Sequence, residues 1–242
     1  MDALHASLYD SRGQLQLISP VGRTTIPGDT DTTSCAILAA LFTGHRVANL
    51  DFMHYMFHDN HYQTFMMERD SSLSTNIYMC ALLAEYRQYD QSNAVLDWLQ
   101  HEIVERGNDT CKWHVSPMYT IGELARVMAR IEHPLAHELA RYAADYLLER
   151  QKADGGWGIN GSTVEETGYA TLGLAAVAEC LDGDWHIHQA LTNAAAYCAS
   201  ASITYDQLWI GKSLYCVEPL VPVLKAVAIQ RVQQLQSSQE IR

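Results

Sequence analysis

The stretch PGDTDTTS, residues 27–34, places two carboxylates, Asp29 and Asp31, one residue apart directly before the apolar run 35–42. Acids and hydroxyls at such a position typically cap a helix, because they accept hydrogen bonds from its free N–H groups and suit the positive end of its dipole. In a dry cavity the same pair could hold a proton for acid catalysis, since burial and a nearby carboxylate both disfavour the ionised form. The segment is therefore a candidate for a helix cap and for a general acid.

Five further segments combine polar and aromatic side chains that could bind or position a ligand. They are TF-x-x-ER-x-SS-x-STN (64–76), KW-x-x-SP-x-Y (112–119), Q-x-x-DGGWG (151–158), EET-x-YA (165–170) and W-x-GKSLY (209–215). As local structure, the third is a turn after a helix, with Trp157 packing back as a structural aromatic residue. His54 and His58 lie at i and i+4 with His61 close by, a spacing that can bind zinc, but no acid lies between His54 and His58 as the general base does in H-E-x-x-H.

Composition excludes several classes of protein. The 242 residues are 48% hydrophobic, which allows a sizeable core in one large domain or two small ones, and the net charge is −12. No run of Lys and Arg of the nucleic-acid-binding type is present. Six cysteines without a C-x-x-C pair indicate reduced thiols. No apolar run approaches the ~20 residues of a membrane helix, and the N-terminus lacks a signal-peptide pattern. We therefore expect a cytoplasmic protein with no stable membrane insertion.

Helical periodicity dominates the elements that must position these residues. We expect nine helices, at 34–43, 49–57, 74–89, 93–106, 120–131, 135–151, 163–181, 186–200 and 217–236. No convincing set of alternating strands appears. Segment 169–180 is apolar nearly all round, which predicts burial by other helices. The fold expected is all-α, a single domain over 1–242 whose paired helices could close into an α/α toroid, with a tail from about 233 that frays.

Together and in this order, the acid motif and the five segments resemble the class II terpene cyclases, which start carbocation cyclisation by protonating an alkene or epoxide. The resemblance runs from about Pro20 to about Pro222 and includes PVGRTTIP before the acid motif. The family's usual acid motif is D-x-D-D, whereas here Thr32 replaces the last Asp. The D-x-D-T-T variant resembles the drimenyl diphosphate synthase-type subgroup, which acts on the sesquiterpene precursor farnesyl diphosphate.

The resemblance implies roles for the acid motif. An alkene is a very weak base, so its protonation needs a carboxylic acid that is still protonated near neutral pH. Asp31 is the implied proton donor, with Asp29 and Thr32 as its neighbours. Asn76 matches the family's Asn that hydrogen-bonds the acid.

A growing carbocation needs aromatic faces and no nucleophiles, and each desolvated face can stabilise it by about 0.5–2 kcal/mol. The candidates are Phe65, Trp113, Tyr119, Tyr169, Trp209 and Tyr215. For each of them, packing in the core is the alternative role.

The diphosphate of the substrate requires positive charge. Lys212 is the candidate implied by the resemblance, followed by Arg23 and Arg69, although a surface lysine is the alternative for Lys212. Mg²⁺ is expected with the diphosphate, because hard cations bind phosphate oxygens. Glu165 and Glu166 could lie near that cation, but acids at a helix start are the alternative.

The expected function is a class II cyclase that converts farnesyl diphosphate to drimenyl diphosphate with the diphosphate retained. The alternatives are a diterpene cyclase that forms a copalyl-type product from geranylgeranyl diphosphate, and a non-catalytic isoprenoid-binding protein. Large class II cyclases carry a second helical domain that 242 residues cannot contain. The chain could therefore act alone, could complete its cavity with a partner or second protomer, or could bind isoprenoids without turnover. A separate phosphatase is a further possible partner.

Overall fold

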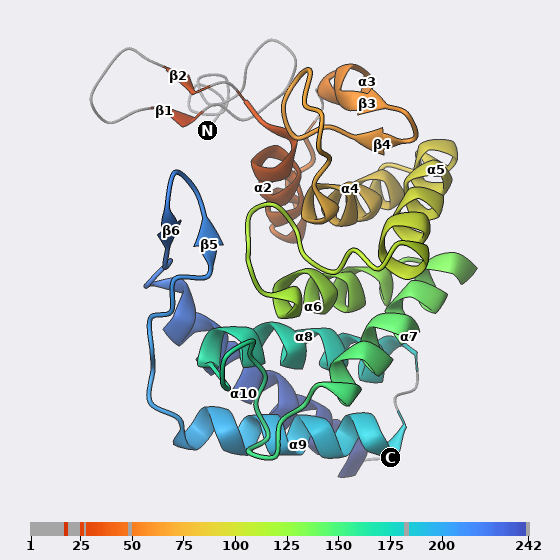
Figure 1. The fold of residues 1–242 in the computed structure, drawn as a ribbon. Coiled ribbons are helices and arrows are strands. Elements are labelled where there is room, and N and C mark those ends of the chain that lie inside the picture. Colours follow the sequence, from red (N-terminus) through yellow and green to blue (C-terminus); the bar gives the residue numbers. More distant parts are fainter. Residues whose placement is uncertain (1–16, 19–24, 27, 48–49, 182–183, 241–242) are drawn as a thin grey trace. The chain divides into compact units, whose positions relative to one another are not determined.

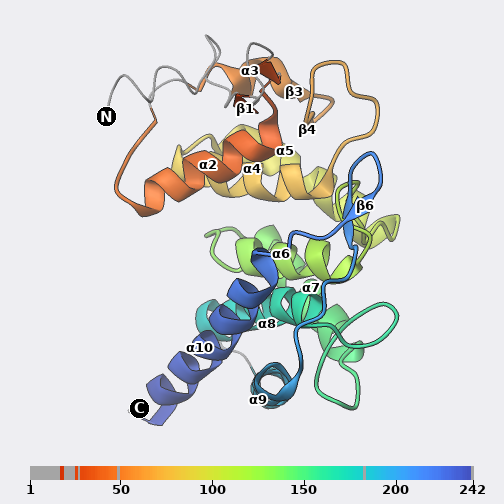
Figure 2. The same cartoon turned by 90° about the vertical axis from the view of Figure 1, so that its left-hand side faces the viewer.

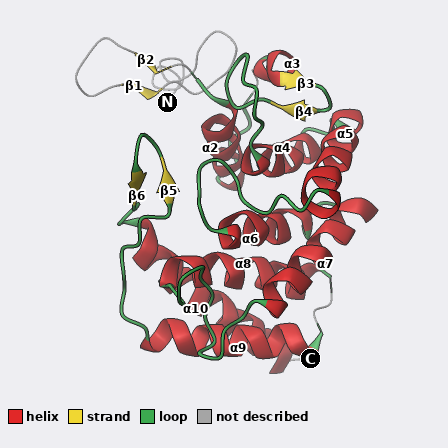
Figure 3. Cartoon of the chain, viewed as in Figure 1, coloured by secondary structure: helices red, strands yellow, loops and turns green. Residues whose placement is uncertain are grey.

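The computed structural model describes residues 17–18, 25–26, 28–47, 50–181 and 184–240. The chain forms two compact units, residues 1–101 and 102–242. Helices dominate the described part of both units, and the strands are pairs of two residues (Figures 1 and 3). The all-α prediction is confirmed, while the single domain over 1–242 stays a prediction.

The first unit is built around α4 (Leu73–Glu85), which packs against α2 (Thr30–Phe42) and α5 (Tyr89–Leu99). Figure 2 shows α2 and α4 side by side. The shorter elements are α3 (Phe52–Met56) and two antiparallel pairs, β1 (Leu17–Ile18) with β2 (Thr25–Ile26), and β3 (Phe57–His58) with β4 (His61–Tyr62). The first eight residues of α4 are all buried, so this helix forms the core of the unit.

The second unit is built around α8 (Val164–Cys180), which contacts α6 (Pro117–Met128), α7 (Pro134–Glu149), α9 (Trp185–Ser200) and α10 (Leu220–Glu240). A hairpin of β5 (Trp209–Ile210) and β6 (Leu214–Tyr215) precedes α10. Because α8 buries 13 of its 17 residues, the prediction that this apolar segment is covered by other helices is confirmed.

Two glycines bring α6 and α8 unusually close. A Cβ added at Gly122 would lie 2.6 Å from the backbone oxygen of Tyr169, and one added at Gly173 would lie 2.7 Å from the backbone oxygen of Gly122. No side chain larger than hydrogen fits these contacts. This approach sets the separation of the two helices that carry Tyr119 and Tyr169.

The nine predicted helices all occur, with shifted ends. The helix predicted at 93–106 is α5 followed by a π-helical segment, η1 (Gln100–Glu105). In η1 the backbone hydrogen bonds span five residues, whereas those of an α-helix span four. The last helix runs to Glu240, and fraying of the tail from about residue 233 stays a prediction. Residues 231–240 contain no Gly or Pro, and their Gln, Leu, Arg and Glu side chains favour helix.

Candidate functional site

The acid motif begins α2. Asp29 is the N-cap, and its carboxylate accepts a hydrogen bond from the backbone N–H of Thr32 at 2.6 Å. The hydroxyl of Thr33 donates to the backbone oxygen of Asp29. The predicted cap is confirmed, and it places Asp31 in the first turn of the helix.

Two hydrogen bonds to Asp31 come from a different helix. The hydroxyls of Thr75 and Ser74, at the start of α4, donate to Asp31 Oδ1 at 3.0 and 3.3 Å. The Thr75 hydroxyl also lies 3.1 Å from that of Thr64. Donors on a carboxylate stabilise its charged form, so these two hydroxyls would favour the anion that remains after Asp31 gives up a proton.

Asn76 does not hold Asp31, which corrects the expectation from the sequence. Its Oδ1 accepts from the backbone N–H of Tyr62 at 2.7 Å, and its Nδ2 donates to the backbone oxygens of Tyr62 and Ser72 at 3.0 and 2.9 Å. These bonds use both amide protons, because an amide NH₂ has only two. Asn76 therefore ties α4 to β4, and its neighbours Ser74 and Thr75 bond the acid.

The surroundings of the acid are rich in buried alcohols, which we call the hydroxyl shell. Each of these side chains is at most 1% exposed, and they come from α2, from the start of α4 and from the loop between β4 and α4. The hydroxyl shell consists of Thr30, Thr33, Ser34, Thr64, Ser72, Ser74 and Thr75.

Three of the six candidate aromatic residues gather in the second unit. The rings of Tyr119, Tyr169 and Trp209 surround that of His114, with centroids 4.9, 5.8 and 5.1 Å from it. We call these four residues the aromatic cluster. Burial, and then the charges of Glu165 and Glu123, raises the pKa of Tyr169 far above its ordinary value, so its phenol stays neutral. The cluster offers aromatic faces of the kind that stabilise a cation.

Glu165 projects from the first turn of α8 onto this cluster. Trp209 Nε1 donates to Glu165 Oε1 at 2.8 Å, and His114 Nε2 lies 3.5 Å from the same oxygen. Glu165 is 2% exposed, and its other oxygen, Oε2, has no hydrogen-bond partner among the described residues. His114, in the KW-x-x-SP-x-Y segment, is not among the predicted site residues, and nothing in the sequence indicates that Glu165 would keep an oxygen unpaired.

The other candidate aromatic residues lie outside the cluster. Phe65, in the first unit, and Tyr215, on β6, are 38% and 45% exposed. Trp113 has the ammonium of Lys112 at 5.3 Å from its ring. Trp157 is fully buried and donates from Nε1 to the backbone oxygen of Leu147 at 2.7 Å, which confirms its structural role.

Two of the three candidate cations are exposed on the surface of their units. Lys212 is exposed in the turn of the β5–β6 hairpin, in the second unit. Arg69 is exposed in the first unit, and Arg23 lies outside the described residues.

The two glutamates suggested for Mg²⁺ do not fit that ion. Glu166 accepts hydrogen bonds from Ser116 Oγ, the Ile159 N–H and Thr163 Oγ1, which occupy both of its oxygens. Glu165 faces the aromatic cluster. Mg²⁺ keeps several waters when it binds carboxylates, and neither buried side chain leaves room for them. The acids instead belong to the first turn of α8, where Thr163 is the N-cap.

Two of the three histidines with zinc spacing have other side-chain contacts. His58 Nδ1 lies 2.9 Å from a carboxylate oxygen of Asp59, and the ring of His61 stacks on Trp98 with centroids 4.9 Å apart. Within the described ranges, no group of three potential ligands from His, Cys, Asp and Glu is found. The six cysteines are free thiols.

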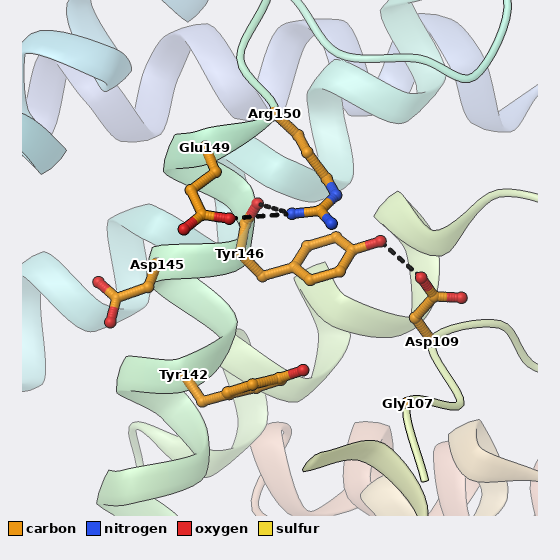
Figure 4. Close-up of a pocket in the computed structure, with 7 residues that line it drawn as sticks. All are labelled: Gly107, Asp109, Tyr142, Asp145, Tyr146, Glu149 and Arg150. Atoms are coloured by element: carbon orange, nitrogen blue, oxygen red, sulfur yellow. Dashed lines mark hydrogen bonds and ion pairs between the residues drawn. The ribbon is translucent and has the colours of Figure 1, made fainter. Parts of the chain in front are cut away.

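A surface cavity of about 430 Å³ lies between α7 and the loop after η1 (Figure 4). The Tyr146 hydroxyl donates to Asp109 at 2.7 Å, and the Arg150 guanidinium lies 3.5 Å from the Tyr146 ring centroid. Asp109, Asp145 and Glu149 outnumber Arg150 in the lining, so this cavity repels a diphosphate.

Comparison with known proteins identifies the kind of chain to which these features belong. The family described as "Squalene-hopene cyclase C-terminal domain" matches residues 63–204, more than half of the sequence. A copalyl diphosphate synthase from Streptomyces anulatus is 27% identical over 89% of the chain and 40% of its own length. An ent-copalyl diphosphate synthase from Streptomyces sp. (strain KO-3988) is 33% identical over 60% of the chain and 29% of its own length.

A solved structure gives the same assignment. The ent-copalyl diphosphate synthase from Streptomyces platensis matches with a TM-score of 0.79 and 25% identity, over 97% of this chain and 45% of that one. This match confirms the predicted helical fold of the terpene cyclases. The chain spans less than half the length of these relatives.

Proposed function

We propose that this chain, which belongs to the squalene-hopene cyclase C-terminal domain family, carries out protonation-initiated cyclisation of a prenyl diphosphate. The observation that carries the proposal is the Asp31 carboxyl group, held at the start of α2 by the Ser74 and Thr75 hydroxyls. Asp31 would donate its proton to the distal alkene, and the two hydroxyls would stabilise the carboxylate left behind.

The substrate favoured by the comparisons is the C20 compound geranylgeranyl diphosphate, with a copalyl-type bicyclic product. The relatives that support it are named copalyl and ent-copalyl diphosphate synthases. The expectation of farnesyl diphosphate and a drimane-type product rests only on Thr32 in the D-x-D-T-T motif, so it becomes the second candidate.

Positive charge for the diphosphate is assigned to Lys212, which is exposed in the β5–β6 turn. Mg²⁺ would accompany the diphosphate as its counter-ion. We expect Lys212→Ala and metal chelation each to raise KM more than they lower kcat, because both act on the part of the substrate that does not react.

The test is product analysis by gas chromatography–mass spectrometry after phosphatase treatment. Wild type, Asp31→Asn and Asp29→Asn are each incubated with Mg²⁺ and either farnesyl or geranylgeranyl diphosphate. A bicyclic alcohol from wild type but not from Asp31→Asn supports the proposal, and the substrate that yields it fixes the chain length. Linear alcohols alone from the wild type would refute cyclisation by this chain and favour an isoprenoid-binding role.

A further inference from the structure

The loop before α8 contains the only Asn-Gly pair of the sequence, Asn160–Gly161. In such a pair the backbone nitrogen of the glycine can attack the side-chain amide carbon of the asparagine, because glycine has no Cβ to obstruct the approach. Both residues are exposed. Apart from the chain neighbours, no described residue comes within 4 Å of a Cβ built at Gly161. Water and hydroxide therefore reach the pair.

The fold holds the residues on either side of the Asn-Gly pair and leaves the pair itself untied. The Ile159 N–H donates to Glu166 Oε1 at 3.0 Å, and the backbone oxygen of Ser162 accepts from the Tyr197 hydroxyl at 2.6 Å. Within the described ranges, neither the amide side chain of the pair nor its glycine N–H forms a hydrogen bond. The two groups that would react thus have no bond to break first.

The other described asparagines are protected from this reaction. Asn76, Asn93 and Asn193 lie inside α4, α5 and α9, where the N–H of the following residue is used by the helical hydrogen bonds. Asn60 and Asn108 are each followed by a residue that carries a Cβ. Only the pair in the loop before α8 combines an exposed amide with a glycine nitrogen that is free to attack.

We propose that Asn160 is a deamidation site and that its reaction loosens the start of α8. The Gly161 nitrogen gives its proton to hydroxide and bonds to the side-chain amide carbon of Asn160, and the amide nitrogen leaves as ammonia. Water then opens the five-membered imide at either carbonyl, which yields aspartate or isoaspartate. The net reaction takes up one water and releases one ammonia, with no change of oxidation state.

The new carboxylate would lie in a loop that already holds two others. Asp154 accepts from the Gly156 N–H and the Ser162 hydroxyl at 3.0 and 2.7 Å, and Glu166 accepts from the Ile159 N–H. A third negative charge within two residues of these bonds repels both carboxylates. Isoaspartate also lengthens the backbone by one carbon. We therefore expect deamidation to weaken the contacts that fix the first turn of α8.

The test is mass spectrometry of folded wild type after incubation at about pH 8 and 37 °C. Cleavage after glutamate places Asn160 in the peptide 150–165, which has no other asparagine. This peptide should gain about 1 Da at least tenfold faster than the peptides that contain Asn108 and Asn193. Asn160→Gln is the matched control, because its longer side chain would have to close a six-membered ring, and it should keep its mass. Equal rates for the three wild-type peptides overturn the proposal.

A second incubation measures what the fold contributes. The same chain is kept unfolded in guanidinium chloride at the same pH and temperature. We expect Asn160 to react in the folded protein within about tenfold of its rate in the unfolded chain, and Asn193 to react at least tenfold more slowly when folded. A larger protection of Asn160 by the fold overturns the proposal.

Thermal unfolding then tests the consequence for α8. The Tm of wild type should fall as the deamidated fraction grows, whereas Asn160→Gln should keep its Tm over the same incubation. Asn160→Asp isolates the effect of the added charge from that of the longer backbone. An unchanged Tm after full conversion overturns the consequence for α8. None of these measurements uses turnover, so their outcome is independent of the proposed function.

Discussion

Thr75→Val tests whether the hydroxyl donors of α4 stabilise the ionised form of the Asp31 carboxyl group. The substitution replaces the hydroxyl that lies 3.0 Å from Asp31 Oδ1 with a methyl group of similar size. A hydrogen bond to a charged group contributes about 1.5–3 kcal/mol. If proton transfer is nearly complete in the transition state, losing this hydrogen bond lowers kcat about tenfold to hundredfold.

The same loss has a signature in the pH dependence. The acid acts only when protonated, so turnover is maximal at low pH and falls as the pH rises and the proton is lost. Without a donor on the carboxylate the proton is held more tightly, and 1.5–3 kcal/mol corresponds to about 1–2 pH units. Thr75→Val should therefore lower the plateau and move the point of half-maximal kcat to higher pH.

The assay is kcat for product formation across pH 4.5–9 for wild type, Thr75→Val and Thr75→Ser. Thr75→Ser keeps the hydroxyl and should remain within about threefold of wild type at the plateau. The reasoning is refuted if the Val and Ser variants, both folded, have the same plateau and the same midpoint.

Three further predictions concern stability. Asn76→Ala leaves backbone groups of β4 and the loop before α4 unpaired, at about 1–3 kcal/mol each, so the Tm falls by several degrees. Gly122→Ala puts a Cβ 2.6 Å from the Tyr169 backbone oxygen and costs about 1–3 kcal/mol in urea unfolding. A Cβ at Gly211 comes nearest to the movable Tyr215 ring, at 3.2 Å, so Gly211→Ala costs less. Burial raises the pKa of Cys198 to about 11. An unfolded thiol ionises near pH 8.5, so ionisation of Cys198 favours the unfolded state as the pH rises from about 8.5 to 11. The free energy of unfolding in urea should therefore fall less between these two pH values for Cys198→Ala than for wild type.

The sequence was sufficient where the chemistry is local. The cap at Asp29 follows from residue types within one turn, and the helices follow from apolar spacing. The choice among Ser74, Thr75 and Asn76 was different. Successive residues on a helix point about 100° apart, so their order does not reveal which of them faces a neighbouring helix. The family resemblance favoured Asn76, and the structure turns Ser74 and Thr75 toward the acid instead.

The aromatic cluster could not be predicted from the sequence. Its members come from the loop before α6, from α6, from α8 and from β5, and only the packing of these elements separates Tyr119, Tyr169 and Trp209 from the exposed Phe65 and Tyr215. The unpaired oxygen of Glu165 is a property of three-dimensional surroundings, so the sequence could not identify it.

The two acids of the motif depend on the fold in different ways. Asp29 receives its hydrogen bond from its own helix, whereas the Ser74 and Thr75 hydroxyls reach Asp31 only while α2 and α4 stay in contact. Local openings of a fold can cost far less than global unfolding. Separation of this helix pair would remove the Ser74 and Thr75 donors from Asp31 and leave the cap at Asp29 in place. The geometry of the acid therefore depends on tertiary packing, whereas the cap depends on the first turn of α2 alone.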